Sequence, residues 1–290
     1  MDSLDFKLAD GRNLDLLIGA GDSKTAIIFH HGTPTCAYIW KPWVEHFEKL
    51  GIRSIAYSRA GYYTSDRKVG REIVSVNSDI AEVLAHFSID SFVAVGWSGG
   101  GPHARASALD PRCKSAVVLA GVGMYDQSDL DFLAGMGEEN VDEFGHALKG
   151  EAELSEWMEA NASAYKTITG EELRSSVGTL YSESDIITMQ RKDYSDGLAE
   201  VYRRSLEVSY SGWIDDDIAF TNDWGFTLDE VKVPVAIFQG DEDLMVPGSH
   251  GRWLHNHLPH STLRLLKGEG HLSFFSASQA EILGFLSGLL

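Results

Sequence analysis

The segment that most restricts the fold runs from residue 92 to residue 101 and reads FVAVGWSGGG. An apolar, β-branched run leads into GWSGG at 96–100, which fits the pattern Gly-x-Ser-x-Gly, and a stretch compatible with a helix follows at once. Strand, tight turn, serine and helix in this order are typical of a nucleophile elbow, whose serine hydroxyl stands clear of the sheet. The segment therefore predicts that Ser98 is a catalytic nucleophile, with the N–H of Gly99 at the helix start facing the reacting centre.

Short apolar strands alternate with amphipathic helices around this segment. Strands are predicted at Thr25–His30, Ile52–Tyr57 and Ala116–Ala120, and helices at Pro42–Leu50 and Ile73–Phe87. Strands that are apolar over nearly their whole length are typical of a parallel sheet buried on both sides. The expected fold class is therefore α/β, with a mostly parallel sheet and helices on both of its faces.

The alternation stops near Gly123 and strand patterns return only at Val233. Residues 124–230 show helical patterns, Leu130–Met136 among them, and hold 25 Asp and Glu against 7 Lys and Arg. This shift of pattern and charge predicts two units. Residues 1–123 and 231–290 form the α/β core, and residues 124–230 form a helical cap, or lid, inserted between core strands.

Composition excludes several classes of partner. The formal net charge of −19 argues against nucleic acid and anionic membrane surfaces, which both require basic patches. No apolar run approaches the roughly 20 residues that cross a bilayer, and residues 1–7 do not resemble a signal peptide, so a cytoplasmic location is expected. Cys36 and Cys113 form neither a metal-binding spacing nor a disulfide framework, and no metal is predicted.

A serine nucleophile needs a base and an acid behind the base, and on this architecture they follow it in the order acid, then histidine. His271 lies in Gly-Glu-Gly-His, directly after a predicted strand at Thr262–Leu266. Asp241 and Asp243 follow the strand that begins at Val233. Asp243 is favoured because it lies deeper in its loop, immediately before the apolar run LMV, and Asp241 stays open as the alternative acid. Asp126 is a further alternative.

The second oxyanion donor is expected on the loop HHGTPT at 30–35. This loop follows the strand Thr25–His30, so the backbone N–H of Thr33 can lie opposite the N–H of Gly99. Two such donors form an oxyanion hole, and each is worth a few kcal/mol of transition-state stabilisation. Pro34 helps to fix the loop.

These motifs together resemble the α/β-hydrolase superfamily. The resemblance covers the whole core: HGTP at 31–34, GWSGG at 96–100, the acid loop at 240–247 and GEGH at 268–271. YSRAGY at 57–62 is similar to the family's Tyr-Asp-x-x-Gly-x loop, with Ser58 in place of the aspartate. Residues 31–40 are also similar to the haloalkane dehalogenase and epoxide hydrolase branch, whose nucleophile is an aspartate, so Ser98 argues for acyl transfer instead.

The resemblance implies a carboxylesterase-like serine hydrolase (EC 3.1.1) that needs no cofactor. Ser98 would be acylated, His271 would carry the proton, Asp243 would orient His271, and an ester, thioester or amide would be cleaved. The substrate is expected to be a small to medium, uncharged, partly hydrophobic molecule, with Trp97, Trp40 and Pro34 beside it. The protein is expected to be a monomer or a homodimer.

Three other functions stay open at this stage. An aminopeptidase of the prolyl iminopeptidase type would bind the substrate amine with its acidic cap, although its usual loop is His-Gly-Gly-Pro-Gly. A hydroxynitrile lyase or a cofactor-free haloperoxidase would use the same three residues without hydrolysis. A ligand receptor that keeps the triad would show slow, single-turnover acylation.

Overall fold

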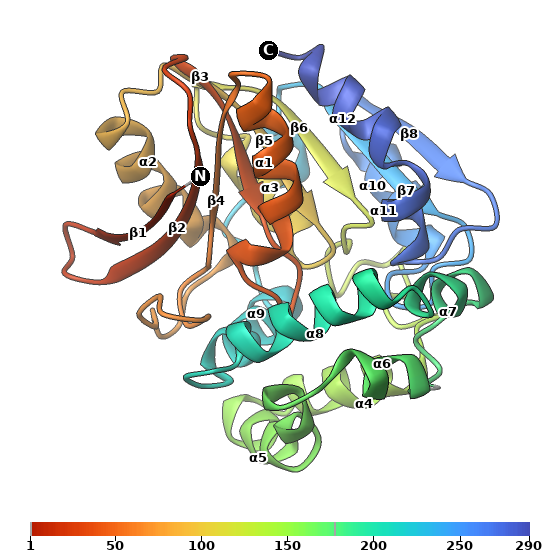
Figure 1. Cartoon of the computed structure of the whole chain (residues 1–290). Coiled ribbons are helices and arrows are strands. Elements are labelled where there is room, and N and C mark those ends of the chain that lie inside the picture. Colours follow the sequence, from red (N-terminus) through yellow and green to blue (C-terminus); the bar gives the residue numbers. More distant parts are fainter. Residues whose placement is uncertain (1, 177) are drawn as a thin grey trace.

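A computed structural model describes residues 2–176 and 178–290 (Figure 1). Its centre is an eight-stranded sheet of order β1-β2-β4-β3-β5-β6-β7-β8. The β1–β2 and β2–β4 pairs are antiparallel, and every other pair is parallel. The mostly parallel sheet is thereby confirmed. The strands are β1 (Asp2–Lys7), β2 (Asn13–Gly19), β3 (Thr25–His30), β4 (Arg53–Tyr57), β5 (Ser91–Trp97), β6 (Cys113–Leu119), β7 (Val235–Gly240) and β8 (Ser261–Leu266).

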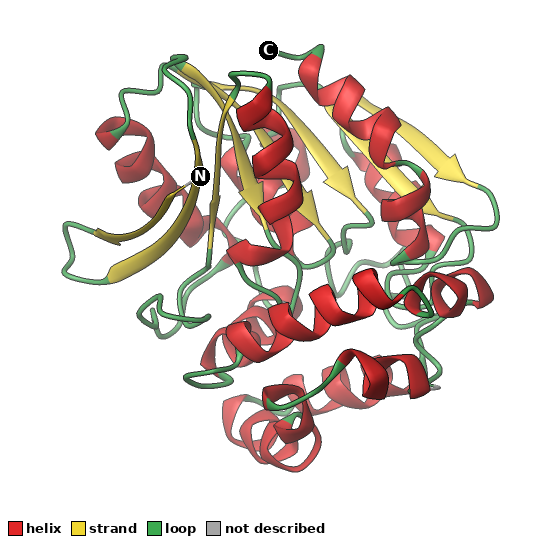
Figure 2. Cartoon of the chain, in the orientation of Figure 1, coloured by secondary structure: helices red, strands yellow, loops and turns green. Residues whose placement is uncertain are grey.

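Helices cover both faces of the sheet because successive side chains of each strand point to opposite faces. In β3, Ile27 and Phe29 pack with α1 (Lys41–Lys49) and α12 (Gln279–Ser287). The alternate side chain, Ile28, packs on the other face with α2 (Val76–His86) and α10 (Gly248–His257). Figures 1 and 2 show the sheet between these two helical layers. The remaining core helices are η1 (Ala37–Trp40), η2 (Ile73–Ser75), α3 (Gly100–Ser107) and α11 (Ser273–Ala277).

The chain between β6 and β7 forms a helical insertion, which Figure 1 shows gathered at the edge where the parallel strands end. This edge is where open α/β sheets place their binding sites. The insertion consists of α4 (Glu138–Ala147), α5 (Glu151–Asn161), η3 (Ser163–Lys166), α6 (Gly170–Ser175), α7 (Glu183–Met189), α8 (Lys192–Ser205), α9 (Ser211–Thr221) and η4 (Leu228–Glu230).

The predicted helix at Leu130–Met136 is wrong. Leu130 forms an isolated β-bridge with Gln127, and a turn follows it. Gly135 has a φ of +88°, outside the right-handed helical region, so the apolar spacing of this stretch cannot continue as a helix. None of the helices in the described ranges is long and apolar enough to cross a membrane.

The turn between β5 and α3 is closely packed around two glycines. A Cβ on Gly96 would lie 2.2 Å from the carbonyl oxygen of Gly100, and a Cβ on Gly100 would lie 2.2 Å from that of His30. His30 is the register partner of Gly96 in the β3–β5 pair, so the loops after these strands begin side by side. Any side chain larger than a hydrogen would push β5, α3 and β3 apart.

We predict that Gly96→Ala lowers the free energy of unfolding by about 1–3 kcal/mol or more, because the added methyl group overpacks rigid backbone. Gly145→Ala is the matched control: Gly145 lies inside α4 and an added Cβ would meet nothing within 4 Å. Replacing a helical glycine of this kind stabilises by about 0.5–1 kcal/mol. Urea unfolding of both variants checks the prediction. Equal stability of the two variants would contradict it.

Candidate active site

Ser98 occupies the strained turn that the sequence predicts for it. It follows β5 directly, and its φ is +54°, a left-handed conformation that non-glycine residues rarely adopt. Its side chain is half-buried and faces a cavity of about 470 Å³. The walls of this cavity come from the core loops on one side and from the helical insertion on the other.

His271 lines the same cavity, and its ring Nδ1 lies 2.8 Å from Oδ2 of Asp243. A carboxylate can only accept a hydrogen bond, so Nδ1 carries the proton and Nε2 is left as the basic nitrogen. Both side chains are almost fully buried. Burial by itself lowers the pKa of His271, but the charge and hydrogen bond of Asp243 raise it more, and the net direction is upward from 6.5.

Asp243 is held in place by four hydrogen bonds. Its Oδ1 accepts from the backbone N–H groups of Met245 and Val246, at 2.9 and 2.8 Å. Its Oδ2 accepts from the side chain of Gln239 at 3.0 Å, in addition to the bond with His271. With both oxygens fully engaged, the carboxylate has little freedom to rotate away from the histidine.

The structure separates the competing acids. Asp241 is exposed, and its Oδ1 accepts from the backbone N–H of Gly268 at 2.7 Å, so it joins the loops after β7 and β8 at the surface. Asp126 is exposed as well. Of the three aspartates, Asp243 is the one in contact with His271.

The histidine loop is anchored by Asp185, a residue of α7 that the sequence did not single out. Asp185 is fully buried, and its Oδ2 accepts from the N–H of His271 at 3.1 Å. Its Oδ1 accepts from the N–H groups of Leu272 and Ser273, at 2.7 and 2.8 Å. A carboxylate of the insertion thus satisfies the free donors at the start of α11 and fixes the backbone of the histidine.

The two expected oxyanion donors lie next to each other. A Cβ on Gly99 would meet the Thr33 hydroxyl at 2.4 Å, and a Cβ on Gly32 would meet Cβ of Ser98 at 3.2 Å. The loop after β3 therefore packs directly on the elbow. Among the described residues, the N–H groups of Thr33 and Gly99 have no acceptor, and both residues line the cavity.

The loop of Thr33 is tied to the insertion through Asp216 of α9, which is fully buried. Oδ2 of Asp216 accepts from the hydroxyls of Thr33 (2.7 Å) and Tyr62 (2.8 Å) and from the guanidinium of Arg59 (2.5 Å). Its Oδ1 accepts from Arg71 at 2.6 Å. Burial tends to raise the pKa of Asp216, but the two arginines outweigh it and hold the pKa well below its ordinary value.

Of the three residues predicted to contact the substrate, two line the cavity and one does not. Trp97 and Pro34 line the cavity. The expectation for Trp40 is wrong: its side chain is fully buried in the core, stacked on Phe29 at a centroid distance of 4.7 Å and packed edge-on against Trp43. Trp40 ends η1, belongs to the core cluster that contains Ile27 and Phe29 of β3, and is not among the described residues that line the cavity.

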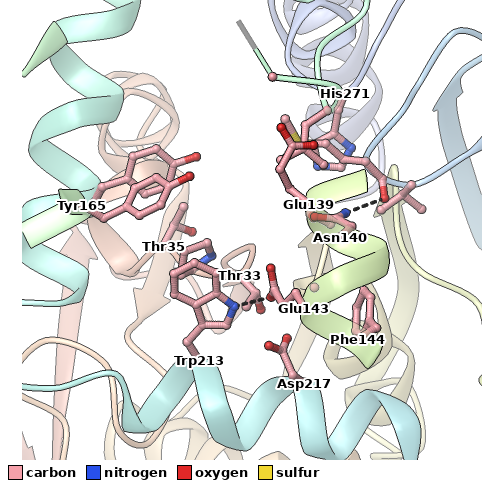
Figure 3. Close-up of a pocket in the computed structure, with 18 of the residues that line it drawn as sticks. Thr33, Thr35, Glu139, Asn140, Glu143, Phe144, Tyr165, Trp213, Asp217 and His271 are labelled. Atoms are coloured by element: carbon pink, nitrogen blue, oxygen red, sulfur yellow. Dashed lines mark hydrogen bonds between the residues drawn. The ribbon is translucent and has the colours of Figure 1, made fainter. Parts of the chain in front are cut away.

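Two acids that sequence reasoning did not single out, Glu143 of α4 and Asp217 of α9, also line the cavity (Figure 3). A signal was available for Asp217. The run WIDDDIAF at 213–220 sets three aspartates between apolar residues, a pattern that places acids on a helix with little exposed surface.

We predict that Asp216→Ala lowers the free energy of unfolding by about 3–5 kcal/mol, because it leaves two buried guanidinium groups without a counter-charge. Asp215→Ala on the same helix is the control and should lose less, because its partner Arg67 is 29% exposed and water can replace the carboxylate. Urea unfolding at neutral pH compares them, and equal losses would contradict this account. The pKa of Asp216 in the folded protein lies below its ordinary value of 3.8. Its contribution to the free energy of unfolding is therefore present above pH 3.8 and is lost as the pH falls further.

Comparison with known proteins agrees with the geometry. The family described as alpha/beta hydrolase fold matches residues 25–278. A probable esterase, D14L, of Oryza sativa subsp. japonica is 26% identical over 270 residues, covering 90% of this chain and 89% of the relative. A bifunctional esterase/perhydrolase, DCH, of Acinetobacter calcoaceticus is 26% identical over 230 residues, covering 76% of this chain and 75% of the relative.

Solved structures with the same fold cover nearly the whole chain. An esterase from Exiguobacterium antarcticum superposes with a TM-score of 0.68 at 19% identity and 97% coverage of both chains. An alpha/beta hydrolase fold protein from Nakamurella multipartita superposes with a TM-score of 0.71 at 20% identity, covering 100% of this chain and 99% of the other. With its sheet order, its elbow and a family match over residues 25–278, the chain belongs to the alpha/beta hydrolase fold family.

Proposed function

We propose that the protein is a serine esterase that cleaves small to medium, partly hydrophobic esters through a covalent acyl-Ser98 intermediate. The observation that carries the proposal is the shared cavity of Ser98 and His271, with Asp243 bonded to the far nitrogen of the histidine. The esterase names of the two relatives support the same reaction class. The aromatic side chains of the insertion that line the cavity would pack against the apolar part of the substrate.

The residues would act in the following order. Nε2 of His271 takes the proton of Ser98 as Oγ attacks the ester carbonyl carbon, and the N–H groups of Thr33 and Gly99 bind the oxyanion. The C–O bond to the alcohol then breaks, and His271 gives its proton to the departing oxygen. Water attacks the acyl-enzyme with His271 again as the base, which releases the carboxylic acid and restores Ser98. Asp243 stabilises the imidazolium in both halves of the cycle.

The charge of the substrate is a separate question from the reaction. The sequence favours an uncharged molecule, whereas the cavity wall includes the carboxyl groups of Glu139, Asp142, Glu143 and Asp217. The esterase proposal therefore concerns the bond that is cleaved and the size of the acyl group. Whether the preferred substrate is charged depends on these four carboxyl groups.

We predict that Ser98→Ala abolishes hydrolysis of p-nitrophenyl esters, with a loss of kcat of about 10⁴-fold or more, because no other group can form the acyl-enzyme. The measurement is a chain-length series from acetate to decanoate, followed by release of p-nitrophenol. Short and medium chains should be preferred, since the cavity is about 470 Å³. Turnover that survives in Ser98→Ala would overturn the proposal.

We also predict the pH dependence of the reaction. His271 must be neutral to act as a base, and its pKa is raised from 6.5. As the pH is lowered, kcat/KM should therefore decrease, with an apparent pKa above 6.5. In Asp243→Asn the burial of the ring is opposed only by the more weakly acting Asp185, so the pKa of His271 should move downward and kcat should drop by about 10⁴-fold. Kinetics and an NMR titration of the ring check both effects.

Asp241→Asn serves as the control for the acid, because Asp241 bonds to the N–H of Gly268 and not to His271. It should leave the titration of His271 where it is in the unmodified protein. A shift of that titration in Asp241→Asn, and none in Asp243→Asn, would reverse the assignment of the acid.

A further inference from the structure

The wall of the active-site cavity carries negative charge without a matching cation. Among the described residues that line it, four are carboxylic acids and none is a lysine or an arginine. Three of these acids project from α4 (Glu138–Ala147) and the fourth, Asp217, from α9. A cavity lined by one sign of charge concentrates ligands of the opposite sign.

Three of these acids have neutral hydrogen-bond donors as partners. Glu139 accepts from the hydroxyl and the N–H of Thr179. The indole Nε1 of Trp157 donates to Asp142 at 2.6 Å, and that of Trp213 donates to Glu143 at 2.5 Å. Such donors hold a carboxylate in one orientation without supplying a positive charge, and Asp142 lies in addition 3.7 Å from Nε2 of His146.

Asp217 differs from its two neighbours on α9. Asp215 is paired with Arg67, and Asp216 with Arg59 and Arg71. Asp217 is 1% exposed, and within the described part of the chain no N–H or O–H group donates to its Oδ2; the carboxyl group of Asp217 instead faces that of Glu143. A buried carboxyl oxygen without a partner is costly in a folded protein, and its position on the cavity wall suggests that a ligand supplies the partner.

Glu143 and Asp217 form a pair, and Figure 3 shows their carboxyl groups turned toward each other beside Trp213, whose indole donates to Glu143. Burial and the facing Glu143 raise the pKa of Asp217 well above its ordinary value. Burial raises the pKa of Glu143 too, although Asp217 and Trp213 lower it in part. Two facing carboxyl groups in a poorly solvated site disfavour each other's ionisation, and no lysine or arginine among the described residues that line the cavity relieves this repulsion.

We propose that Glu143 and Asp217 form a subsite for a protonated amine, so that the preferred substrates are esters that carry a primary or secondary ammonium group. The inference rests on the esterase proposal, because the subsite opens into the cavity of Ser98. An ammonium between the two carboxyl groups supplies donors to the unpartnered Oδ2 and a counter-charge for the pair. Trp213 and Tyr165, packed edge to face at 5.9 Å, line the cavity as an apolar wall for the alkyl chain of the ligand.

The first experiment compares substrates that differ only in charge. Each p-nitrophenyl ω-aminoacyl ester is paired with the ester in which methyl replaces the ammonium, for instance 6-aminohexanoyl with heptanoyl, over acyl chains of several lengths. A second arm carries the amine on the alcohol side, as aminoalkyl butyrates against alkyl butyrates. The ammonium member of at least one pair should have a kcat/KM about tenfold higher or more, the range of a buried charge-assisted hydrogen bond.

The variants Glu143→Gln and Asp217→Asn test the carboxyl pair itself. In each, the ratio of kcat/KM between the ammonium and methyl esters should fall toward one, whatever the absolute rate. Glu138→Gln is the matched control, because it removes one charge from the same helix at an exposed position outside the cavity. Its ratio should equal that of the unmodified protein. An equal fall in all three variants would indicate a general effect of charge and would overturn the subsite.

A binding measurement separates this inference from the esterase proposal. Calorimetric titration of Ser98→Ala with hexylammonium chloride and with 1-hexanol should show binding of the amine and weaker binding or none of the alcohol. Amine binding without ester turnover would keep the subsite and overturn the esterase. Turnover of the methyl esters with no preference for ammonium and no amine binding would keep the esterase and overturn the subsite.

Discussion

The arrangement of the site depends on the ion pairs and hydrogen bonds of the buried Asp216 carboxylate. This carboxylate lies on the insertion and binds Arg59 and Arg71 of the core together with the hydroxyl of Thr33. Two guanidinium groups compensate its charge and two hydroxyls complete its hydrogen bonds, so the desolvation cost of the cluster is offset only while all the partners stay in place. The helix α9 is thereby fixed relative to the loop of Thr33, the proposed oxyanion donor, and the next residue of that helix, Asp217, is fixed at the cavity wall.

The two sides of the proposed reaction centre are held by different physical means. On the nucleophile side, steric exclusion dominates: Gly96, Gly100 and the backbone of His30 approach so closely that the turn has little room for another conformation. On the histidine side, hydrogen bonds dominate, since Asp243 fixes the ring and Asp185 fixes the backbone of the same residue. Asp185 comes from α7 and Asp216 from α9, so the helical insertion covers the site and also holds two of its loops.

Much of the fold was predictable because it depends on local pattern. Near-continuous apolar strands separated by amphipathic helices specify a parallel sheet with two helical layers, and the observed strand pairs agree. Two predictions from the sequence were wrong, one for a local and one for a non-local reason. At Leu130–Met136 the apolar spacing suits a helix, but Gly135 adopts a positive φ and the stretch becomes a turn. Trp40 lies close in the sequence to the loop HGTP at 31–34, yet proximity along the chain does not decide which way a side chain points, and the indole packs on Phe29.

By itself the sequence determined the order of the motifs along the chain, the elbow at Ser98 and the loops that carry Asp243 and His271, because glycine spacing and apolar periodicity act within a few residues. Only the tertiary structure brings Asp243, and not Asp241, into contact with the histidine, although both aspartates lie in the same loop. It also decided that the consecutive acids Asp215 and Asp216 pair with arginines far away in the chain while Asp217 faces the carboxyl group of Glu143. Charge compensation inside a protein depends on which distant segments the fold brings together, and no local pattern encodes that.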